Sequence, residues 1–260
     1  MKIIAVANQK GGVGKTTTSV NLSAALAAMG KRLLLIDLDP QGNATVSVGI
    51  DKAAADFTVF DLLVDQIPLQ RAVTNLPQLA LDCIPANGDL TAAEVALLSM
   101  DAREQQLKKA LSAGHADYDF VIIDCPPSLN MLTLNALVAA DSVLITMQCE
   151  YFALEGLSAL IDTVNSVRET VNADLTIEGI LRTLYDPRNA LTNEVSEQLH
   201  EHFDGLVYRT VIPRNIRLAE APSHGVPGIV YDRLSRGATA YMALAGEFMR
   251  RQEQVSKDTS

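Results

Sequence analysis

Short apolar runs alternate along this chain with stretches of helical periodicity, and this alternation limits the possible folds more than any other feature. The apolar runs span residues 3–8, 32–37, 79–85, 120–126, 142–148, 176–185 and 206–213. The helical stretches span residues 15–29, 88–98, 103–112, 129–139, 153–171, 191–203 and 236–251. Several runs are apolar at every position, as expected for strands covered on both faces. The sequence therefore predicts an α/β fold of three layers, in which a twisted, mostly parallel β-sheet lies between helices.

The chain has 260 residues, of which 48% are hydrophobic, and no linker or low-complexity tract divides it. We therefore expect one domain over residues 1–254, followed by a disordered tail over the polar residues 255–260. Without a CxxC pair, Cys83, Cys125 and Cys149 are expected to be small buried apolar residues. The sequence has no signal peptide and no apolar run of membrane-spanning length, which favours a cytoplasmic location.

A glycine-rich loop joins the first expected strand to the first expected helix. Its sequence, NQKGGVGKTT, nearly matches the phosphate-binding pattern GxxxxGK[ST], but a glutamine stands where the pattern begins with glycine. Backbone N–H groups in such a loop and the N-terminus of the following helix bind phosphate anions. The residues expected to bind nucleotide here are Gln9, Lys10, Gly11, Gly12, Val13, Gly14, Lys15, Thr16 and Thr17. Lys15 is expected to contact the β- and γ-phosphates, Thr16 to ligate Mg²⁺ and Thr17 to bind the α-phosphate.

Aspartates stand at the ends of two expected strands. Asp37 and Asp39 lie in LLIDLDPQGN, and Asp124 closes the apolar run FVIID. Strand ends in open α/β sheets line the ligand crevice, and an acidic residue there can hold Mg²⁺. A helix cap or a turn remains the alternative role for each of these residues.

Four motifs together, NQKGGVGKTT, LLIDLDPQGNAT, IIDCPPS and VIPRNIRLAEAPSHG, resemble those of the ParA/MinD group of P-loop ATPases with a deviant Walker A loop. The resemblance is closest to the chromosomal ParA, or Soj, branch. The motifs extend from residue 8 to residue 225, so the resemblance covers nearly the whole chain. It implies a P-loop NTPase fold, ATP or ADP as ligand, Mg²⁺ as the metal, and slow hydrolysis of ATP.

The resemblance also implies catalytic roles for Lys10, Lys15 and Asp39. In such ATPases the lysine at position 10 reaches the nucleotide of a second copy, so that ATP drives formation of a homodimer. Asp39 would position the attacking water. Thr16, Asp39 and Asp124 would form the metal site, with Asp124 acting through water.

The segment after the last expected strand would hold the adenine base. In this interpretation Pro213 packs against the ring, Asn215 reads the base edge and Arg214 lies between them. An ordinary turn between a strand and a helix is the alternative.

Residues 205–251 contain seven arginines and three acidic residues, an excess of four positive charges in a chain whose net charge is −10. The resemblance implies that the ATP-bound dimer binds double-stranded DNA non-specifically, which arginine–phosphate contacts can achieve. Arg188, Arg217 and Arg236 are the expected DNA contacts, and solvated surface arginines are the alternative. A ParB-like protein would stimulate hydrolysis, and the protein would associate with the nucleoid. Whether the cargo is a chromosome or a plasmid stays open.

Two other functions remain open within the same group of proteins. A membrane-cycling positioning ATPase like MinD would need an amphipathic helix at its C-terminus. The last expected helix carries an apolar stripe of Tyr241, Leu244, Ala245, Phe248 and Met249. We expect this stripe to pack on the sheet, and the ending QEQVSKDTS is too polar to insert, so no membrane partner is expected. A reductase like the nitrogenase iron protein would need cysteines that bridge an iron–sulfur cluster, whereas the positions of the cysteines here favour a structural role.

Overall fold

The computed structural model describes residues 1–114 and 117–258, and within them seven strands form one sheet. The strands are β1 (Lys2–Ala7), β2 (Leu33–Asp37), β3 (Thr74–Leu76), β4 (Leu81–Ile84), β5 (Phe120–Asp124), β6 (Ser142–Gln148) and β7 (Thr176–Thr183). They lie in the order β3-β4-β2-β5-β1-β6-β7. Neighbouring strands are parallel, except that β3 runs antiparallel to β4. The predicted α/β fold with a mostly parallel sheet is confirmed.

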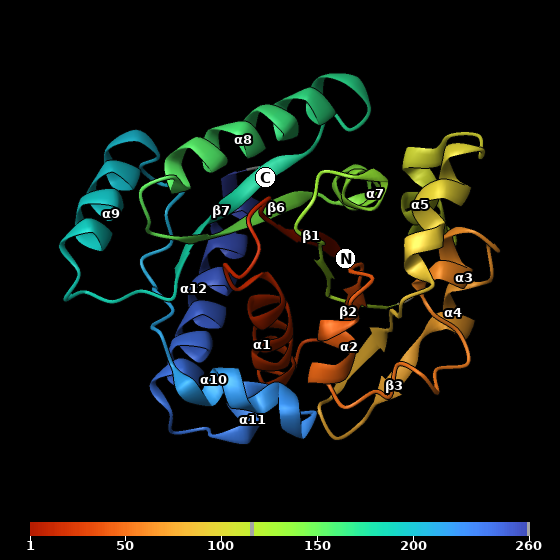
Figure 1. Ribbon diagram of the computed structural model, residues 1–260, viewed down its shortest axis with the longest axis horizontal. Coiled ribbons are helices and arrows are strands. Elements are labelled where there is room, and N and C mark those ends of the chain that lie inside the picture. Colours follow the sequence, from red (N-terminus) through yellow and green to blue (C-terminus); the bar gives the residue numbers. More distant parts are fainter. Residues whose placement is uncertain (115–116, 259–260) are drawn as a thin grey trace.

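Helices cover both faces of the sheet, with α1 and α12 on one side and α7 and α8 on the other (Figure 1). The first side comprises α1 (Lys15–Ala28), α2 (Asn43–Ser47), α10 (Ile216–Glu220), the 3₁₀ helix η2 (Ala221–His224), α11 (Gly228–Tyr231) and α12 (Arg236–Asp258). The remaining helices are α3 (Val59–Leu63), α4 (Leu69–Ala72), α5 (Leu90–Leu98), η1 (Arg103–Gln105), α6 (Gln106–Ala113), α7 (Met131–Ala139), α8 (Ala153–Thr170) and α9 (Ala190–His202).

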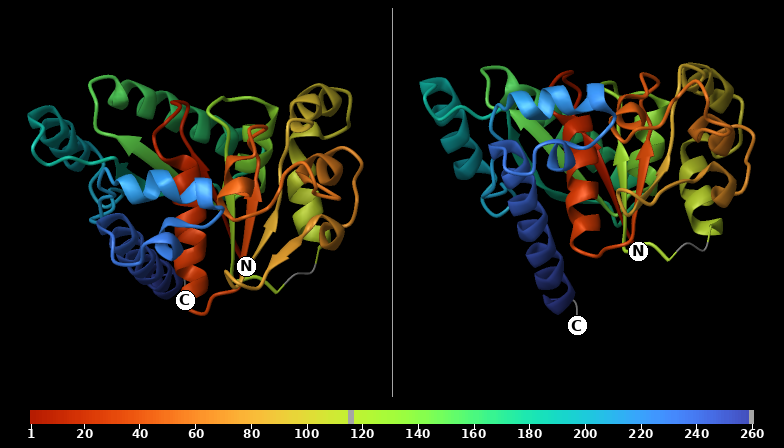
Figure 2. Two further views of the ribbon diagram at one scale, coloured as in Figure 1. Left: turned by 60° about the horizontal axis from the view of Figure 1, so that its bottom comes forward. Right: turned by 90° about the horizontal axis from the view of Figure 1, so that it is seen from below.

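Side chains alternate between the two faces along the central strands. In β1, Ile4 and Val6 pack with residues of α1 and α12, whereas Ala5 and Ala7 pack with residues of α7 and α8. Both sets are buried, which explains why the run is apolar at every position. The carboxyl ends of the parallel strands and the loop after β1 meet at one edge, and the N-terminus lies at the opposite edge (Figure 2).

The apolar stripe of α12 packs inward, as expected. Tyr241, Leu244, Ala245 and Phe248 are each at most 1% exposed and belong to the core between this helix, α1 and the sheet. All three cysteines are buried and free, in agreement with the sequence prediction. None of the helices in the described ranges combines the length and hydropathy needed to cross a bilayer.

The predicted last strand (206–213) is wrong. This segment forms two isolated bridges, Val207 with Ile180 of β7 and Pro213 with Tyr185, which follows β7. The N–H groups of Tyr208 and Ile212 donate to carbonyls of β7, so part of the expected pairing remains. Between these bridges the N–H groups of Arg209 and Thr210 donate to the carboxylate of Glu247, so no continuous strand forms. An apolar run predicts that its side chains are buried, but it does not identify the groups that bond to its backbone N–H and C=O groups.

Other differences concern short elements and the C-terminus. The sequence did not predict β3, α2, α3, α4, α10 or α11, which have three to five residues each. Such elements are too short to develop a recognisable period. Helix α12 extends to Asp258, into the tail that was expected from residue 255, and residues 259–260 lie outside the described residues.

Candidate functional site

The glycine loop lies between β1 and α1, at the edge where the parallel strands end. Gly12 and Gly14 have φ values of +74° and +82°, which side chains rarely allow. A Cβ atom on Gly14 would lie 3.5 Å from the Thr183 side chain. The Thr183 hydroxyl donates a 2.7 Å hydrogen bond to the carbonyl of Val13, so the end of β7 fixes the loop from the side.

The backbone donors of this loop are free to bind an anion. Within residues 1–114 and 117–258, no acceptor receives a hydrogen bond from the N–H groups of Gly11, Gly12, Val13 or Gly14. These donors directly precede the N-terminus of α1, which adds a partial positive charge. Four adjacent unsatisfied donors at a helix N-terminus make the cradle that a phosphate group fits.

Lys15 extends this cradle with a buried cation. The residue is 7% exposed, and its ammonium donates a 3.0 Å hydrogen bond to the carbonyl of Lys10. Burial lowers the pKa of Lys15, while the charges of Asp124 and Asp39 act in the opposite direction. The ammonium is thus poorly solvated and close to carboxylates, and an added anion would stabilise it.

Two aspartates face each other at the ends of adjacent strands. Asp37 of β2 is the register partner of Asp124 of β5, and both residues are fully buried. Asp37 accepts hydrogen bonds from the backbone N–H (2.8 Å) and the hydroxyl (2.7 Å) of Thr45 in α2. Asp124 accepts one from the Ser19 hydroxyl of α1 at 2.9 Å. Its second oxygen, Oδ2, is buried and has no hydrogen-bond partner in the described part of the chain.

The two carboxyls hold protons more tightly than ordinary aspartates. Burial, followed by the charge of Asp37, raises the pKa of Asp124 to about 8, and the hydroxyls of Thr16 and Ser19 oppose the shift. Burial likewise raises the pKa of Asp37 to about 6, against the hydrogen bonds from Thr45. An unsatisfied carboxylate oxygen in such a position is what a divalent cation would neutralise.

The donor set fits Mg²⁺ better than a metal held by protein alone. No group of three or more His, Cys, Asp or Glu residues suited to hold a metal occurs among the described residues. Mg²⁺ commonly takes one or two protein oxygens and completes its shell with phosphates and water. Asp124 and the hydroxyl of Thr16, which lies at the start of α1, are such a pair.

Asp39 stabilises a turn, which is the alternative role expected for it from the sequence. Its carboxylate accepts a 2.9 Å hydrogen bond from the N–H of Gln41, and its carbonyl accepts another from Gly42. The residue is 8% exposed, so it lies at the inner side of the crevice. Asp39, Lys15 and Asp124 lie close enough together for their charges to act on one another.

Helix α2 connects this site to the C-terminal part of the chain. At its end, Gly49 has a φ of +87°, and a Cβ atom there would lie 2.8 Å from the carbonyl oxygen of Gly225. The two backbones therefore touch without side chains between them. Thr45, the middle residue of α2, ties the helix to Asp37.

The segment Pro213–Asn215 lies where β7 ends and α10 begins. Asn215 caps α10, because its side-chain oxygen accepts from the N–H groups of Arg217 (2.9 Å) and Leu218 (3.2 Å). This leaves the amide nitrogen of Asn215 as the group free to meet a ligand. A cavity of about 280 Å³ opens beside the first turn of α1, lined by Thr16 and Thr17 and by residues that follow this segment, such as Leu218. Residues 213–215 are not among its lining residues.

The ammonium of Lys10 pairs with a residue outside the glycine loop. Its ammonium forms an ion pair with Glu150, which follows β6, and both side chains are about half exposed. The next two residues, Tyr151 and Phe152, are 75% and 72% exposed. Their rings pack edge to face with centroids 5.0 Å apart. None of these three residues after β6 was predicted from the sequence, although two adjacent aromatic residues are unusual in a chain with 5% aromatic residues.

The three expected DNA contacts differ in their surroundings. Arg188 pairs with Asp186 at 2.7 Å, and Arg217 pairs with Glu220 at 2.9 Å and with Asp232 at 3.4 Å. Arg236 begins α12, is exposed and has no ion-pair partner among the residues that the structure describes. The structure brings Arg217 and Arg236 to neighbouring elements, since α10 and α12 are in contact.

Comparison with known proteins agrees with this geometry. The family model described as "AAA domain" matches residues 1–177. The sporulation initiation inhibitor protein Soj of Bacillus subtilis is 55% identical over 246 residues, which cover 95% of this chain and 97% of Soj. The chromosome partitioning protein ParA of Caulobacter vibrioides is 47% identical over 254 residues, 97% of this chain and 95% of that protein.

A solved structure is also similar over the whole chain. Cobyrinic acid a,c-diamide synthase from Mycobacterium smegmatis, solved with ADP and magnesium and with an ATP analog and magnesium, has a TM-score of 0.85. It shares 38% sequence identity, with 97% of this chain and 96% of the other covered.

Proposed function

Because this chain belongs to the ParA/Soj family of chromosome-partitioning ATPases, we propose that it is a DNA-segregation ATPase that binds ATP with Mg²⁺. The observation that carries the proposal is the glycine loop, in which four unpaired N–H donors stand beside the buried ammonium of Lys15. The unsatisfied oxygen of Asp124 supports a metal at the same place. Nucleotide and magnesium in the similar M. smegmatis structure add further support.

Each residue of the site has a task in this proposal. The loop N–H groups and Lys15 hold the β- and γ-phosphates, and Thr17 holds the α-phosphate. Thr16 would hold Mg²⁺, and Asp124 would act on it through water. The metal, when bound, neutralises charge on the phosphate oxygens. Asp39 positions the attacking water.

The proposed active form is a homodimer in which Lys10 acts in trans. The ammonium leaves Glu150 and meets the phosphates of the second copy, where it stabilises the charge of the transferring phosphoryl group. Tyr151 and Phe152 stand next to Glu150, and exposed aromatic rings are typical of interface centres. We place them in the contact between the two copies.

Pro213, Arg214 and Asn215 hold the adenine base in this proposal. The free amide nitrogen of Asn215 donates to the base edge, since its oxygen is engaged in capping α10. Pro213 packs against the ring.

The dimer then binds double-stranded DNA without reading its sequence. Arg188, Arg217 and Arg236 contact phosphates, and dimerisation doubles their number. A ParB-like partner stimulates the slow hydrolysis and releases the DNA. The protein works in the cytoplasm on the nucleoid. A membrane-cycling role is not favoured, because the apolar stripe of α12 is buried in the core.

DNA pelleting tests the proposal. The protein is mixed with DNA and ATP, ADP or no nucleotide, at about 50 and 200 mM salt. Pelleting with ATP alone is expected, strongest for the hydrolysis-blocked variant Asp39→Ala, and it should fall steeply with salt. Pelleting that ignores the nucleotide, or that does not respond to salt, would count against the proposed cycle.

A further inference from the structure

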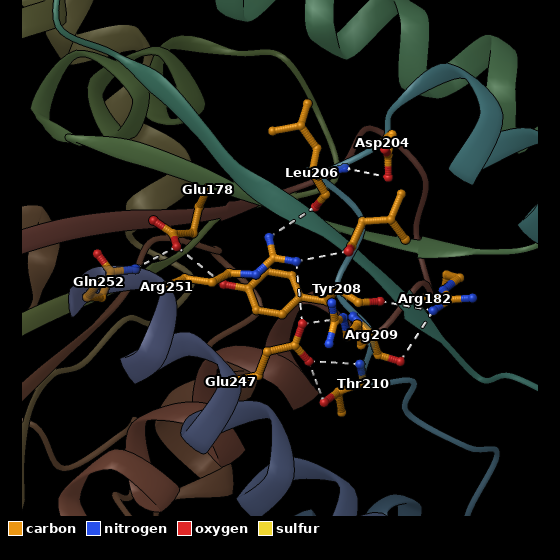
Figure 3. Close-up of polar contacts among 12 residues, drawn as sticks. Glu178, Arg182, Asp204, Leu206, Tyr208, Arg209, Thr210, Glu247, Arg251 and Gln252 are labelled. Carbon is orange, nitrogen blue, oxygen red and sulfur yellow. Dashed lines mark hydrogen bonds and ion pairs between the residues drawn. The ribbon is translucent and has the colours of Figure 1, made fainter. Parts of the chain in front are cut away.

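A buried carboxylate of α12 holds the segment that leads to Pro213–Asn215. Glu247 is 8% exposed and faces this segment (Figure 3). Its Oε1 accepts from the N–H of Arg209 at 2.8 Å, and its Oε2 accepts from both the N–H (2.8 Å) and the hydroxyl (2.7 Å) of Thr210. Both adjacent N–H groups therefore donate to one carboxylate, whereas in a regular strand they would point to opposite sides.

Two guanidinium groups hold the carbonyls of the same stretch. Arg251, one turn after Glu247, donates to the carbonyl of Val207 at 2.9 Å and lies 3.9 Å above the ring of Tyr208. From the opposite side, Arg182 of β7 donates to the carbonyl of Tyr208 at 2.9 Å (Figure 3). Charged side chains therefore supplement the backbone hydrogen bonds that Ile180 of β7 makes with Leu206 and Tyr208.

The next residue of β7 links this arrangement to the glycine loop. Thr183, adjacent to Arg182, donates to the carbonyl of Val13. At its other end, α12 touches the same segment again, because a Cβ atom on Gly237 would lie 3.1 Å from the side chain of Asn215. The course of residues 209–215 is thus set by α12 at two points.

Glu247 is suited to this task because it stays ionised. Partial burial acts to raise the pKa of Glu247, but hydrogen bonds from Thr210 and Arg209 and the charge of Arg251 outweigh it and leave the pKa below its ordinary value. An ionised carboxylate gives strong, short hydrogen bonds to backbone N–H groups.

We propose that Glu247 is a positioning residue for the nucleotide base: it fixes residues 209–215 so that Pro213 and Asn215 meet the adenine. This inference rests on the proposed function. It predicts that loss of Glu247 weakens binding of the base and spares binding of the phosphates, which the glycine loop holds by itself.

The test uses the full chain with Glu247→Gln, which keeps the shape and presents an amide N–H₂ to one of the two backbone donors. Thr210→Val, which removes only the hydroxyl contact, is the milder second variant. Glu253→Gln, an exposed acid on the same helix, is the control. Calorimetry measures binding of ATP and of inorganic triphosphate, which has no base. Hydrogen exchange measures protection of the Arg209 and Thr210 amides.

For Glu247→Gln, the Kd for ATP should rise about tenfold, the Kd for triphosphate should stay unchanged, and both amides should exchange faster. Thr210→Val should shift ATP binding in the same direction by about threefold. Unchanged ATP binding in Glu247→Gln, or equal losses for both ligands in the two variants, would overturn the inference. Failure of the unsubstituted chain to bind either ligand would instead contradict the proposed function.

Discussion

The ammonium of Lys10 is paired with the carboxylate of Glu150 in the same chain. Both side chains are about half exposed, and ion pairs in that setting contribute only about 0–1 kcal/mol. Lys10 therefore has a resting partner that is easily exchanged. A triphosphate on a second copy carries more negative charge than one carboxylate and would compete for the lysine effectively.

Replacement of Lys10 by alanine should separate nucleotide binding from dimer formation. The backbone carbonyl that Lys15 contacts remains, so ATP should bind with an affinity within about threefold of the original value. The proposed ATP-dependent dimer should then be absent in size-exclusion chromatography with light scattering. Lys109→Ala, at an exposed position on α6, is the matched control and should dimerise normally. A Lys10→Ala protein that still dimerises with ATP would remove the role in trans.

The aromatic pair after β6 should contribute to the same contact. Phe152→Ser is expected to raise the dimer dissociation constant by tenfold or more, since aromatic interface residues commonly contribute about 2 kcal/mol. Stability of the single chain should hardly change, because the ring is 72% exposed. Val95→Ser, on the exposed face of α5, tests whether loss of any exposed apolar side chain has this effect. Analytical ultracentrifugation with ATP measures the dimer dissociation constant of both variants. Equal constants for Phe152→Ser and Val95→Ser would mean that the aromatic pair lies outside the contact between the two copies.

Asp124 should be destabilising in the metal-free protein. Asp124→Asn removes a buried carboxylate with one unsatisfied oxygen beside Asp37, so the free energy of unfolding without Mg²⁺ should rise by about 1–3 kcal/mol. The stabilisation that Mg²⁺ and ATP give to the original protein should largely vanish. Urea denaturation with and without both ligands measures the two effects. Asp101→Asn, at an exposed site, should change neither, and lower metal-free stability of Asp124→Asn would contradict the argument.

Arginines of the C-terminal part should govern the salt dependence of DNA binding. Arg236→Ala and Arg217→Ala are each expected to weaken binding about three- to tenfold, and each should reduce the slope of log affinity against log salt by about one, since one DNA phosphate is no longer neutralised. Arg71→Ala is the matched control, because this arginine stacks on Phe57 elsewhere in the chain. Fluorescence anisotropy across several salt concentrations provides the slopes. If the slopes equal that of Arg71→Ala, these arginines do not contact DNA phosphates and are only solvated surface residues.

The sequence predicted the layers of the fold because continuously apolar runs require cover on both faces. It failed at residues 206–213, where the run is apolar but two of its N–H groups donate to Glu247, a residue more than thirty positions away. Periodicity reports which side chains are buried. It cannot report which group accepts a backbone hydrogen bond, and the strand prediction failed for that reason.

In the candidate site, too, the sequence predicted which residues lie close together but not all of the hydrogen bonds between them. Motif spacing brought together Lys15, Asp39 and Asp124, since the ends of parallel strands meet at one edge. It did not reveal the Ser19 hydroxyl on Asp124 or the Thr183 hydroxyl on the loop. These contacts join elements that no local pattern relates. The individual roles of the loop residues and of residues 213–215 remain predictions.

The close approach of Gly49 and Gly225 limits how this protein can change shape. Side chains at a helix contact usually absorb small displacements by changing rotamer, but here a carbonyl meets bare backbone. A displacement of α2 toward residue 225 would therefore push the turn there instead of being absorbed by side chains. The 3₁₀ helix η2, which follows α10 directly and ends just before Gly225, would then be pushed as well.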